Sequence, residues 1–162
     1  MNLQHLFQTA KQLRQPSASA AAEFEASRDG LAEELNRRMS VRPDLEKLIG
    51  SENLAMMQDN SRNFCRFMGG MFRAYEPEVL AQTALWVFRA YRSHGFKTTY
   101  WPANLDTFVS IARDRLGSAT FDEIYPFFQW LIVNVPTFVK ISDEQLADPV
   151  SPEPNHGVIK KP

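Results

Sequence analysis

Apolar residues recur along this chain at intervals of three and four positions, the period of an α-helix. The segment NLQHLFQTAKQLRQ places its apolar side chains on one stripe and stops before Pro16. A second helix is predicted from about residue 19 to residue 39. The segment RPDLEKLIG is a short helix, in which Pro43 suits the first turn and Gly50 suits the end. No stretch has the alternation of a strand, so the pattern predicts an all-α fold.

Longer helices are predicted in the second half of the chain. Ser51 is expected to cap the long segment ENLAMMQDNSRNFCRFMGGMFRAY. Pro77 opens the next helix, which Gly95 closes, and ANLDTFVSIARDRL forms another that ends at Gly117.

The last helix begins at a motif typical of helix N-termini. Thr120 and Glu123 have the spacing of a capping box, T-F-D-E. Pro126 is expected to kink this helix and Pro136 to bend or end it, because proline lacks the backbone N–H that a helix interior needs. From Ser142 onward the polar, Pro-rich sequence SDEQLADPVSPEPNHGVIKKP predicts a disordered tail.

Length and composition narrow the class of protein. The chain has 162 residues, of which 44% are hydrophobic, enough for one helical domain over residues 1–141 with a flexible tail over 142–162. A net charge of −1 argues against a nucleic-acid binder. The single Cys65 favours a reducing cytoplasm, and no signal peptide or 20-residue apolar run predicts export or a membrane span.

Two adjacent glycines lie in the middle of the long helix at FMGGMF. Each of Gly69 and Gly70 costs about 1 kcal/mol relative to alanine in a helix interior, which predicts a close approach to the backbone. Arg62, Arg66 and Arg73 form a stripe that the glycines flank. One interpretation is a local helix crossing or bend. The other is a dimer or partner contact in which the arginines pair with acidic groups, although arginines alone also fit a solvated face.

The helix over residues 77–94 is apolar on most sides and is therefore predicted to be central to the core. His94 falls on its apolar arc in the last turn. Neutral imidazole is a good iron ligand, which makes His94 a candidate haem ligand. The alternative is a histidine whose contacts are backbone carbonyls and the helix dipole.

Three motifs in this order carry a resemblance to a known family. They are RAYRSHGF, YWPANLDTF and RLGSATFDEIYPFFQWL, and together they resemble the second half of a globin over about residues 60–140. LGSATFDEI is similar to the junction between the last two helices of bacterial globins. SHGF…WP is similar to the corner after the proximal histidine, and GFKTTYW is similar to globin-coupled sensors.

The resemblance can be aligned in two ways. Matching the corner by His94 and Pro102 makes His94 the proximal ligand. Matching it by Gly95 and Trp101 puts Tyr91 at the ligand position, as in non-haem globin-like sensor domains such as those of stressosome proteins. The resemblance therefore implies a globin-like bundle of about seven helices with a sensory or regulatory role, in which haem is not required.

Other chemistry is limited to a few candidates. Trp86, Tyr91, Phe96 and Trp101 are among the aromatic residues that could line a pocket for a flat apolar ligand, with core packing as the default. Cys65 lies near arginines that could lower its pKa, but no histidine is near it in sequence. The chain contains no Gly-rich phosphate loop and no HExxH motif, so no enzyme is predicted.

These observations lead to one prediction with two alternatives. The chain is predicted to be a cytoplasmic, globin-like regulatory domain and a homodimer. Its signal would shift helix packing around residues 77–94 and be read by a separate signalling protein at the Gly69/Gly70 surface. The first alternative is a haem-binding globin with His94 as the axial ligand. The second is a binder of a bilin or another hydrophobic ligand.

Overall fold

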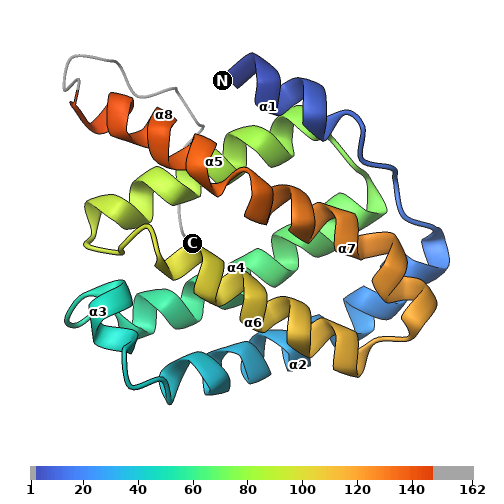
Figure 1. Cartoon of the computed structure of the whole chain (residues 1–162). Coiled ribbons are helices and arrows are strands. Elements are labelled where there is room, and N and C mark those ends of the chain that lie inside the picture. Colours follow the sequence, from blue (N-terminus) through green and yellow to red (C-terminus); the bar gives the residue numbers. More distant parts are fainter. Residues whose placement is uncertain (1–2, 148–162) are drawn as a thin grey trace, which may run out of the picture.

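The structure is a computed structural model that describes residues 3–147. Its regular elements are all helices (Figure 1): α1 (Leu3–Ala10), α2 (Ala18–Ser40), α3 (Leu45–Ile49), α4 (Leu54–Arg73), α5 (Pro77–Ser93), α6 (Tyr100–Arg115), α7 (Ser118–Val133) and α8 (Val135–Ala147). No strand occurs in the described part of the chain. The all-α prediction is therefore confirmed.

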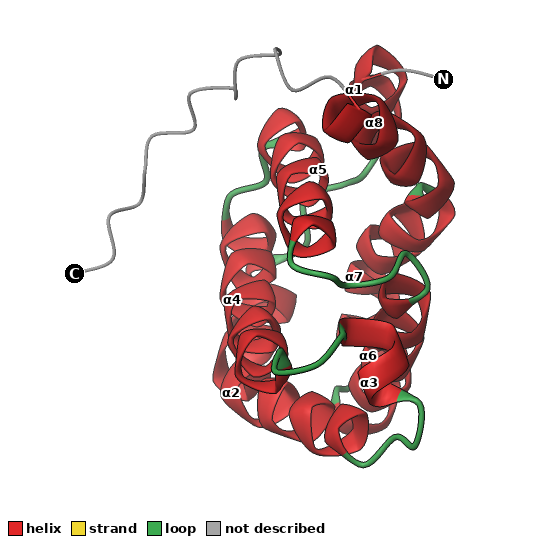
Figure 2. Ribbon diagram, turned by 90° about the vertical axis from the view of Figure 1, so that its left-hand side faces the viewer, coloured by secondary structure: helices red, strands yellow, loops and turns green. Residues whose placement is uncertain are grey.

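The helices form two layers. Figure 2 shows α4 and α5 on one side and α6, α7 and α8 on the other, with α2 across the base. α2 packs mainly against α4, α6 and α7, whereas α5 packs mainly against α8 and α1. α5 therefore lies at an edge of its layer.

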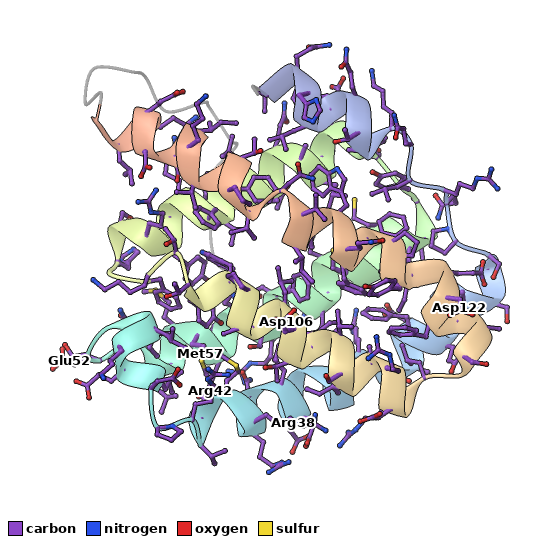
Figure 3. The ribbon with its side chains drawn as sticks, in the orientation of Figure 1. Arg38, Arg42, Glu52, Met57, Asp106 and Asp122 are labelled. Atoms are coloured by element: carbon purple, nitrogen blue, oxygen red, sulfur yellow. The ribbon has the colours of Figure 1, made fainter. Side chains whose placement is uncertain are left out.

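Aromatic rings occupy the contact between α2, α4 and α7. Phe24 of α2 meets Phe72 of α4 edge-on, with 4.8 Å between ring centroids, and Phe72 meets Phe127 of α7 at 5.2 Å. Met57 lies inside among the packed side chains, whereas Asp122 points outward (Figure 3). Because each aromatic ring buries on the order of 150–250 Å², this contact holds a large share of the core.

The N-terminus of α2 is capped both locally and from α7. Ser17 is the N-cap residue, and its hydroxyl oxygen accepts the N–H of Ala20 at 3.1 Å. The N–H and the hydroxyl of Ser17 both donate to the carboxylate of Glu123, at 2.9 Å each. A residue of α7 therefore completes the cap of α2.

The N-terminus of α7 is capped in return by Glu23 of α2. The Glu23 carboxylate accepts the N–H of Gly117 at 2.7 Å and the hydroxyl of Thr120. These bonds, first the one from Gly117, lower the pKa of Glu23. The predicted capping box is wrong, because α7 begins at Ser118 and both Thr120 and Glu123 bond to α2 instead of to each other.

The corner before α4 also differs from the prediction. Gly50 ends α3 as expected, with a φ of +82° that favours glycine. Asn53, not Ser51, precedes α4, and its side-chain amide donates to the carbonyls of Ile49 at 2.7 Å and His94 at 2.8 Å. Asn53 thereby ties this corner to the end of α5.

The apolar run IYPFFQWLIVNVPTFV is divided between α7 and α8. α7 continues across Pro126 and ends at Val133. Its C-cap residue, Asn134, donates from the side-chain amide to the carbonyl of Trp130 at 2.8 Å. Pro136 lies in the first turn of α8, so the predicted helix boundary there is confirmed. Within residues 3–147, no helix combines the length and apolar character needed to cross a membrane.

The predicted boundary between domain and tail is wrong, because it falls inside α8. This helix runs through Ala147, and Ser142 is fully buried. The guanidinium of Arg92 on α5 donates to the Ser142 hydroxyl at 2.6 Å and lies 2.7 Å from the carboxylate of Asp143. The polar residues that suggested a tail are the ones that hold α8 to α5. Residues 148–162 of the predicted tail lie outside the described chain.

Candidate functional site

α5 forms where the sequence predicts it. Pro77 occupies its first turn, and Gly95, with a φ of +102°, follows its C-cap. The residues that α5 buries share one face: Leu80, Ala81, Leu85 and Phe88. This inner face packs into the domain.

The outer face of α5 carries three apolar residues and one threonine. We call Val79, Thr83, Trp86 and Ala90 the α5 stripe. At 100° per residue these four positions fall within about 60° of one another, opposite the inner face. Trp86 is 44% exposed and the other three are half-buried. The prediction that α5 lies at the centre of the core is therefore wrong, because α5 packs mainly on α8 and α1. Val79 still contacts the core, but Trp86 on the outer face is open to solvent.

Polar residues border the α5 stripe along one flank. Glu78, Gln82 and Arg89 fall on the same side of the helix, within about 40° of one another. Glu78 and Gln82 are exposed and Arg89 is half-buried. Among the described residues, neither Glu78 nor Arg89 has an ion-pair partner. Both charges are therefore available to a partner.

Several of the aromatic residues predicted to line a ligand pocket come together. Tyr91 meets Phe96 at 5.0 Å and Trp101 at 5.9 Å between ring centroids, and Tyr100 contacts both Phe96 and Trp101 at 5.0 Å. Trp86 lies apart from them on the outer face. The rings fill the space between α5 and α6 by packing on one another.

One polar atom in this aromatic cluster lacks a partner. The indole Nε1 of Trp101 is buried and makes no hydrogen bond within the described structure. The Tyr100 hydroxyl nearby does have one, accepting the side-chain amide of Asn104 at 3.0 Å. An unpaired buried N–H costs roughly 1–3 kcal/mol, which a ligand carrying an acceptor would recover.

His94 does not face inward, contrary to the prediction. It is the C-cap residue of α5 and is exposed. Its backbone carbonyl, not its ring, makes the contact to Asn53. The prediction assumed that the whole apolar arc of α5 is buried, whereas the part of it that carries Trp86 and Ala90 belongs to the outer face.

The two glycines of α4 have different surroundings. Gly69 is buried against α2, and a Cβ there would lie 3.0 Å from the Glu25 carboxylate and 3.7 Å from the Phe24 ring. A Cβ on Gly70 would meet nothing within 4 Å. The helix-crossing interpretation is confirmed for Gly69, and a partner cannot reach this residue without displacing α2.

The predicted arginine stripe lies on the exposed face of α4. Arg62 pairs with Asp59 at 2.9 Å, and Arg66 donates to the side-chain oxygen of Asn63 at 3.4 Å. Arg73 is exposed at the end of the helix. These contacts are local to one helix, as on an ordinary solvated face. Binding of an acidic partner by these arginines stays a prediction.

Cys65 was considered as a nucleophile with a lowered pKa, but its buried position argues against this role. The thiol is buried between α4 and the core, and this burial raises its pKa to about 12. A thiol with such a pKa is almost wholly protonated at neutral pH and is a poor nucleophile. Within residues 3–147, no three His, Cys, Asp or Glu side chains are grouped so that they could hold a metal ion.

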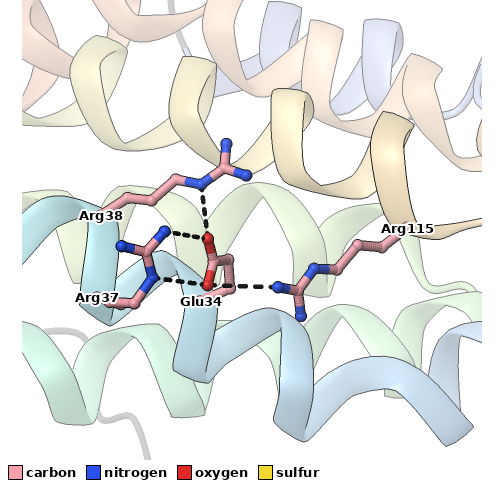
Figure 4. A network of polar contacts seen from close by, with 4 residues as sticks. All are labelled: Glu34, Arg37, Arg38 and Arg115. Carbon is pink, nitrogen blue, oxygen red and sulfur yellow. Dashed lines mark hydrogen bonds and ion pairs between the residues drawn. The ribbon is translucent and has the colours of Figure 1, made fainter.

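A carboxylate surrounded by arginines connects α2 to α6 (Figure 4). Glu34, whose side chain is 11% exposed, accepts hydrogen bonds from Arg37 at 3.0 and 2.7 Å and from Arg38 at 2.9 Å. Arg115 of α6 lies 3.3 Å from its second oxygen. The hydrogen bonds from Arg37 and then Arg38 lower the pKa of Glu34 from 4.5 to about 2. The network joins helices and contains no reactive group.

A shallow depression of about 330 Å³ lies beside this network. It is lined by Ala26, Ser27, Gly30, Leu31 and Arg115. Small side chains form most of this lining, and Arg115 is already engaged by Glu34. The depression therefore lacks the convergent polar groups of a small-molecule site.

The residues of the α5 stripe and its charged flank were missed by the sequence analysis, except for Trp86. The signal was present: positions 79, 83, 86 and 90 have the 4-3-4 spacing of a helix–helix seam. It was hidden because the opposite face of the same helix is also apolar. The sequence matches no protein-family model, and comparisons with curated proteins and with solved structures find no match either.

Proposed function

We propose that this protein is a non-catalytic regulatory domain that binds another polypeptide through the outer face of α5. The observation that carries the proposal is Trp86, which is 44% exposed in the middle of an apolar stripe. Tryptophan is enriched among the residues that dominate binding energy at protein interfaces. An apolar stripe on a solvent-facing helix is also the surface that helix-mediated recognition uses.

The inner face of α5 contacts α6 and α8, so a partner bound to the outer face could change the packing of these helices. Phe88, on the inner face of α5, contacts the rings of Trp101 at 5.4 Å and Phe138 at 6.0 Å. Arg92 holds α8 through Ser142 and Asp143. A partner that shifts α5 therefore acts on α6 and α8 as well. A sensory role in the cytoplasm, of the kind implied by the resemblance to globin-like sensor domains, would use this coupling.

Site-specific photo-crosslinking in the native host tests the proposal. A benzophenone amino acid replaces Thr83 in the α5 stripe, and the matched control replaces Ser110, an exposed residue of α6. We expect position 83 to give a covalent protein adduct that position 110 does not give, and Trp86→Ala to reduce its yield. Equal adduct patterns at the two positions would overturn the proposal. Mass spectrometry of the adduct identifies the partner.

A second candidate function is binding of a flat apolar ligand at the aromatic cluster. The unpaired Nε1 of Trp101 favours it, because that N–H is a ready donor for a ligand acceptor. Titration with haem or a bilin, followed by absorption, provides the test. Binding that is weakened by Trp101→Phe, which keeps the ring and removes the N–H, would support it, and the absence of any spectral change would argue against these two ligands.

A further inference from the structure

We infer that the polypeptide bound by the α5 stripe is a second copy of this chain, with the two α5 helices packed antiparallel across a two-fold axis. The inference rests on the proposed function and names its partner. Three properties of α5 support it: the spacing of the stripe, the sizes of its side chains and the charges along its flank.

The spacing of the α5 stripe matches a seam between two helices. Val79, Thr83, Trp86 and Ala90 are separated by four, three and four residues, the alternation that keeps side chains facing a partner helix. On the opposite side, Ala81 and Phe88 face the domain's own core. α5 is therefore built to pack on two sides at once.

The side-chain sizes favour the antiparallel direction. In an antiparallel register, Trp86 lies opposite Thr83 of the second copy, and Val79 lies opposite Ala90 of the second copy. Each layer then combines a larger with a smaller side chain, as close packing requires. In a parallel pair, each residue meets its own copy, which places Trp86 against Trp86 and Ala90 against Ala90.

The charges favour the same direction. Glu78 and Arg89 lie on one flank of the stripe, 11 positions apart, which is about 16 Å along the helix. When two helices run antiparallel, this flank faces the same flank of the partner. Glu78 then approaches Arg89 of the second copy, and the two-fold axis repeats the pair.

A parallel pair does not bring these charges together. Its geometry sets the Glu78–Arg89 flank of one helix against the opposite flank of the other. That opposite flank carries the apolar, half-buried Val87. The flanking charges therefore distinguish the two orientations, as they do in helix pairs generally.

The dimer is expected to be weak. One 17-residue helix from each copy buries less than the roughly 1,200 Å² of a stable interface. Sedimentation velocity should therefore cover about 5 to 500 µM, where a micromolar self-association appears as a rise in mean mass with concentration. A monomer throughout this range would overturn the inference.

Truncating the central tryptophan is the first variant to measure. Trp86→Ala should weaken dimerisation at least about 30-fold, because interface tryptophans typically contribute 2 kcal/mol or more. Leu54→Ala is the matched control, since Leu54 is also 44% exposed but lies on α4. Circular dichroism verifies that both variants keep their helices. An equal effect of the two substitutions would contradict the inference.

Charge reversal tests the orientation without removing any apolar contact. Glu78→Arg and Arg89→Glu each set like charges opposite one another in the antiparallel pair, and each should weaken dimerisation about 3- to 10-fold. The double variant restores opposite charges and should return to within about 2-fold of the original protein. Additive weakening in the double variant would exclude the antiparallel pair.

Failure of this inference can be separated from failure of the proposed function. Purified full-length protein with benzophenone at position 83 should form a covalent dimer joined through α5, and mixed isotope labelling proves that the link is between copies. A crosslink to residues 148–162 of the same chain, or a cellular adduct with another protein, would overturn the second copy as partner. Only the cellular adduct would leave the proposed function standing.

Discussion

α2 and α5 are both long helices, but they are held in the domain by different means. α2 packs mainly against three helices, and polar side chains connect it to all three. Ser17 and Glu23 bond to α7, Glu34 pairs with Arg115 of α6, and the side-chain amide of Asn36 donates to a backbone carbonyl of α4. α5 packs mainly on α8 and α1, and Arg92 connects it to α8. On its outer face, Trp86 stays open to solvent.

The difference indicates that α2 mainly stabilises the fold, whereas α5 also presents a surface to a partner. In α2 the apolar face is covered and the polar groups bond across helix boundaries. In α5 the exposed part of Trp86 adds nothing to the stability of a single chain. Apolar area removed from water contributes about 25 cal/mol per Å², and on the outer face of α5 this contribution is left for association.

The largest effect is expected where α2 crosses α4. Gly69→Leu would drive a side chain into the Phe24 ring and the Glu25 carboxylate, and should reduce the free energy of unfolding by about 3 kcal/mol or more. Urea denaturation followed by circular dichroism measures the loss. The substitution would act on folding and not on dimerisation, because Gly69 belongs to an internal contact.

The neighbouring glycine is the matched control. A Cβ on Gly70 has open space, so Gly70→Ala should increase the free energy of unfolding by about 1 kcal/mol, the helix propensity difference between the two residues. Opposite signs at adjacent positions would locate the crossing at Gly69. A loss of stability at Gly70 would mean that the helix is rotated relative to α2.

The glycine pair shows which features of the fold could be predicted from the sequence and which could not. Helical periodicity located α4, and the cost of glycine in a helix predicted a close approach there. Periodicity does not state which helix approaches, because Phe24 is about 45 residues away in sequence and its position depends on the whole fold. The helix end at Gly95 was predictable for the opposite reason, since a φ of +102° is a local requirement.

The wrong predictions share a cause in long-range contacts. Thr120 and Glu123 fit a local capping motif, yet Glu23 and Ser17 offered bonds from another helix. Ser142 and Asp143 look like the start of a polar tail until Arg92 is placed beside them. The 4-3-4 spacing on the outer face of α5 indicates a helix seam but not what covers it, because an apolar side chain can face either the core of its own chain or a partner.

A smaller and more local effect is expected at the contact between α5 and α8. Arg92→Ala removes the guanidinium that bonds the buried Ser142 hydroxyl and pairs with Asp143, and should loosen α8 by roughly 2 kcal/mol. Hydrogen exchange should show faster exchange in α8 while α2 stays protected. Arg66→Ala on the exposed face of α4 is the control and should change neither. Faster exchange in α2 would mean that the two regions unfold together.

The smallest effect at neutral pH concerns the arginine network of α2, and its size depends on pH. The pKa of Glu34 is lowered from 4.5 to about 2 in the folded chain, so its carboxylate contributes stability that is fully present above pH 4.5 and is lost as pH falls toward 2. Glu34→Gln keeps the shape and removes the titration. The difference in free energy of unfolding between the original protein and this variant should therefore shrink steadily between about pH 5 and pH 2.5. Glu23, whose pKa is also lowered, leaves a residual slope of the same sign in the variant. A difference that stays constant with pH would mean that the three arginines hold Glu34 by shape and hydrogen bonding alone, and that α2, like α5, depends on packing more than on charge.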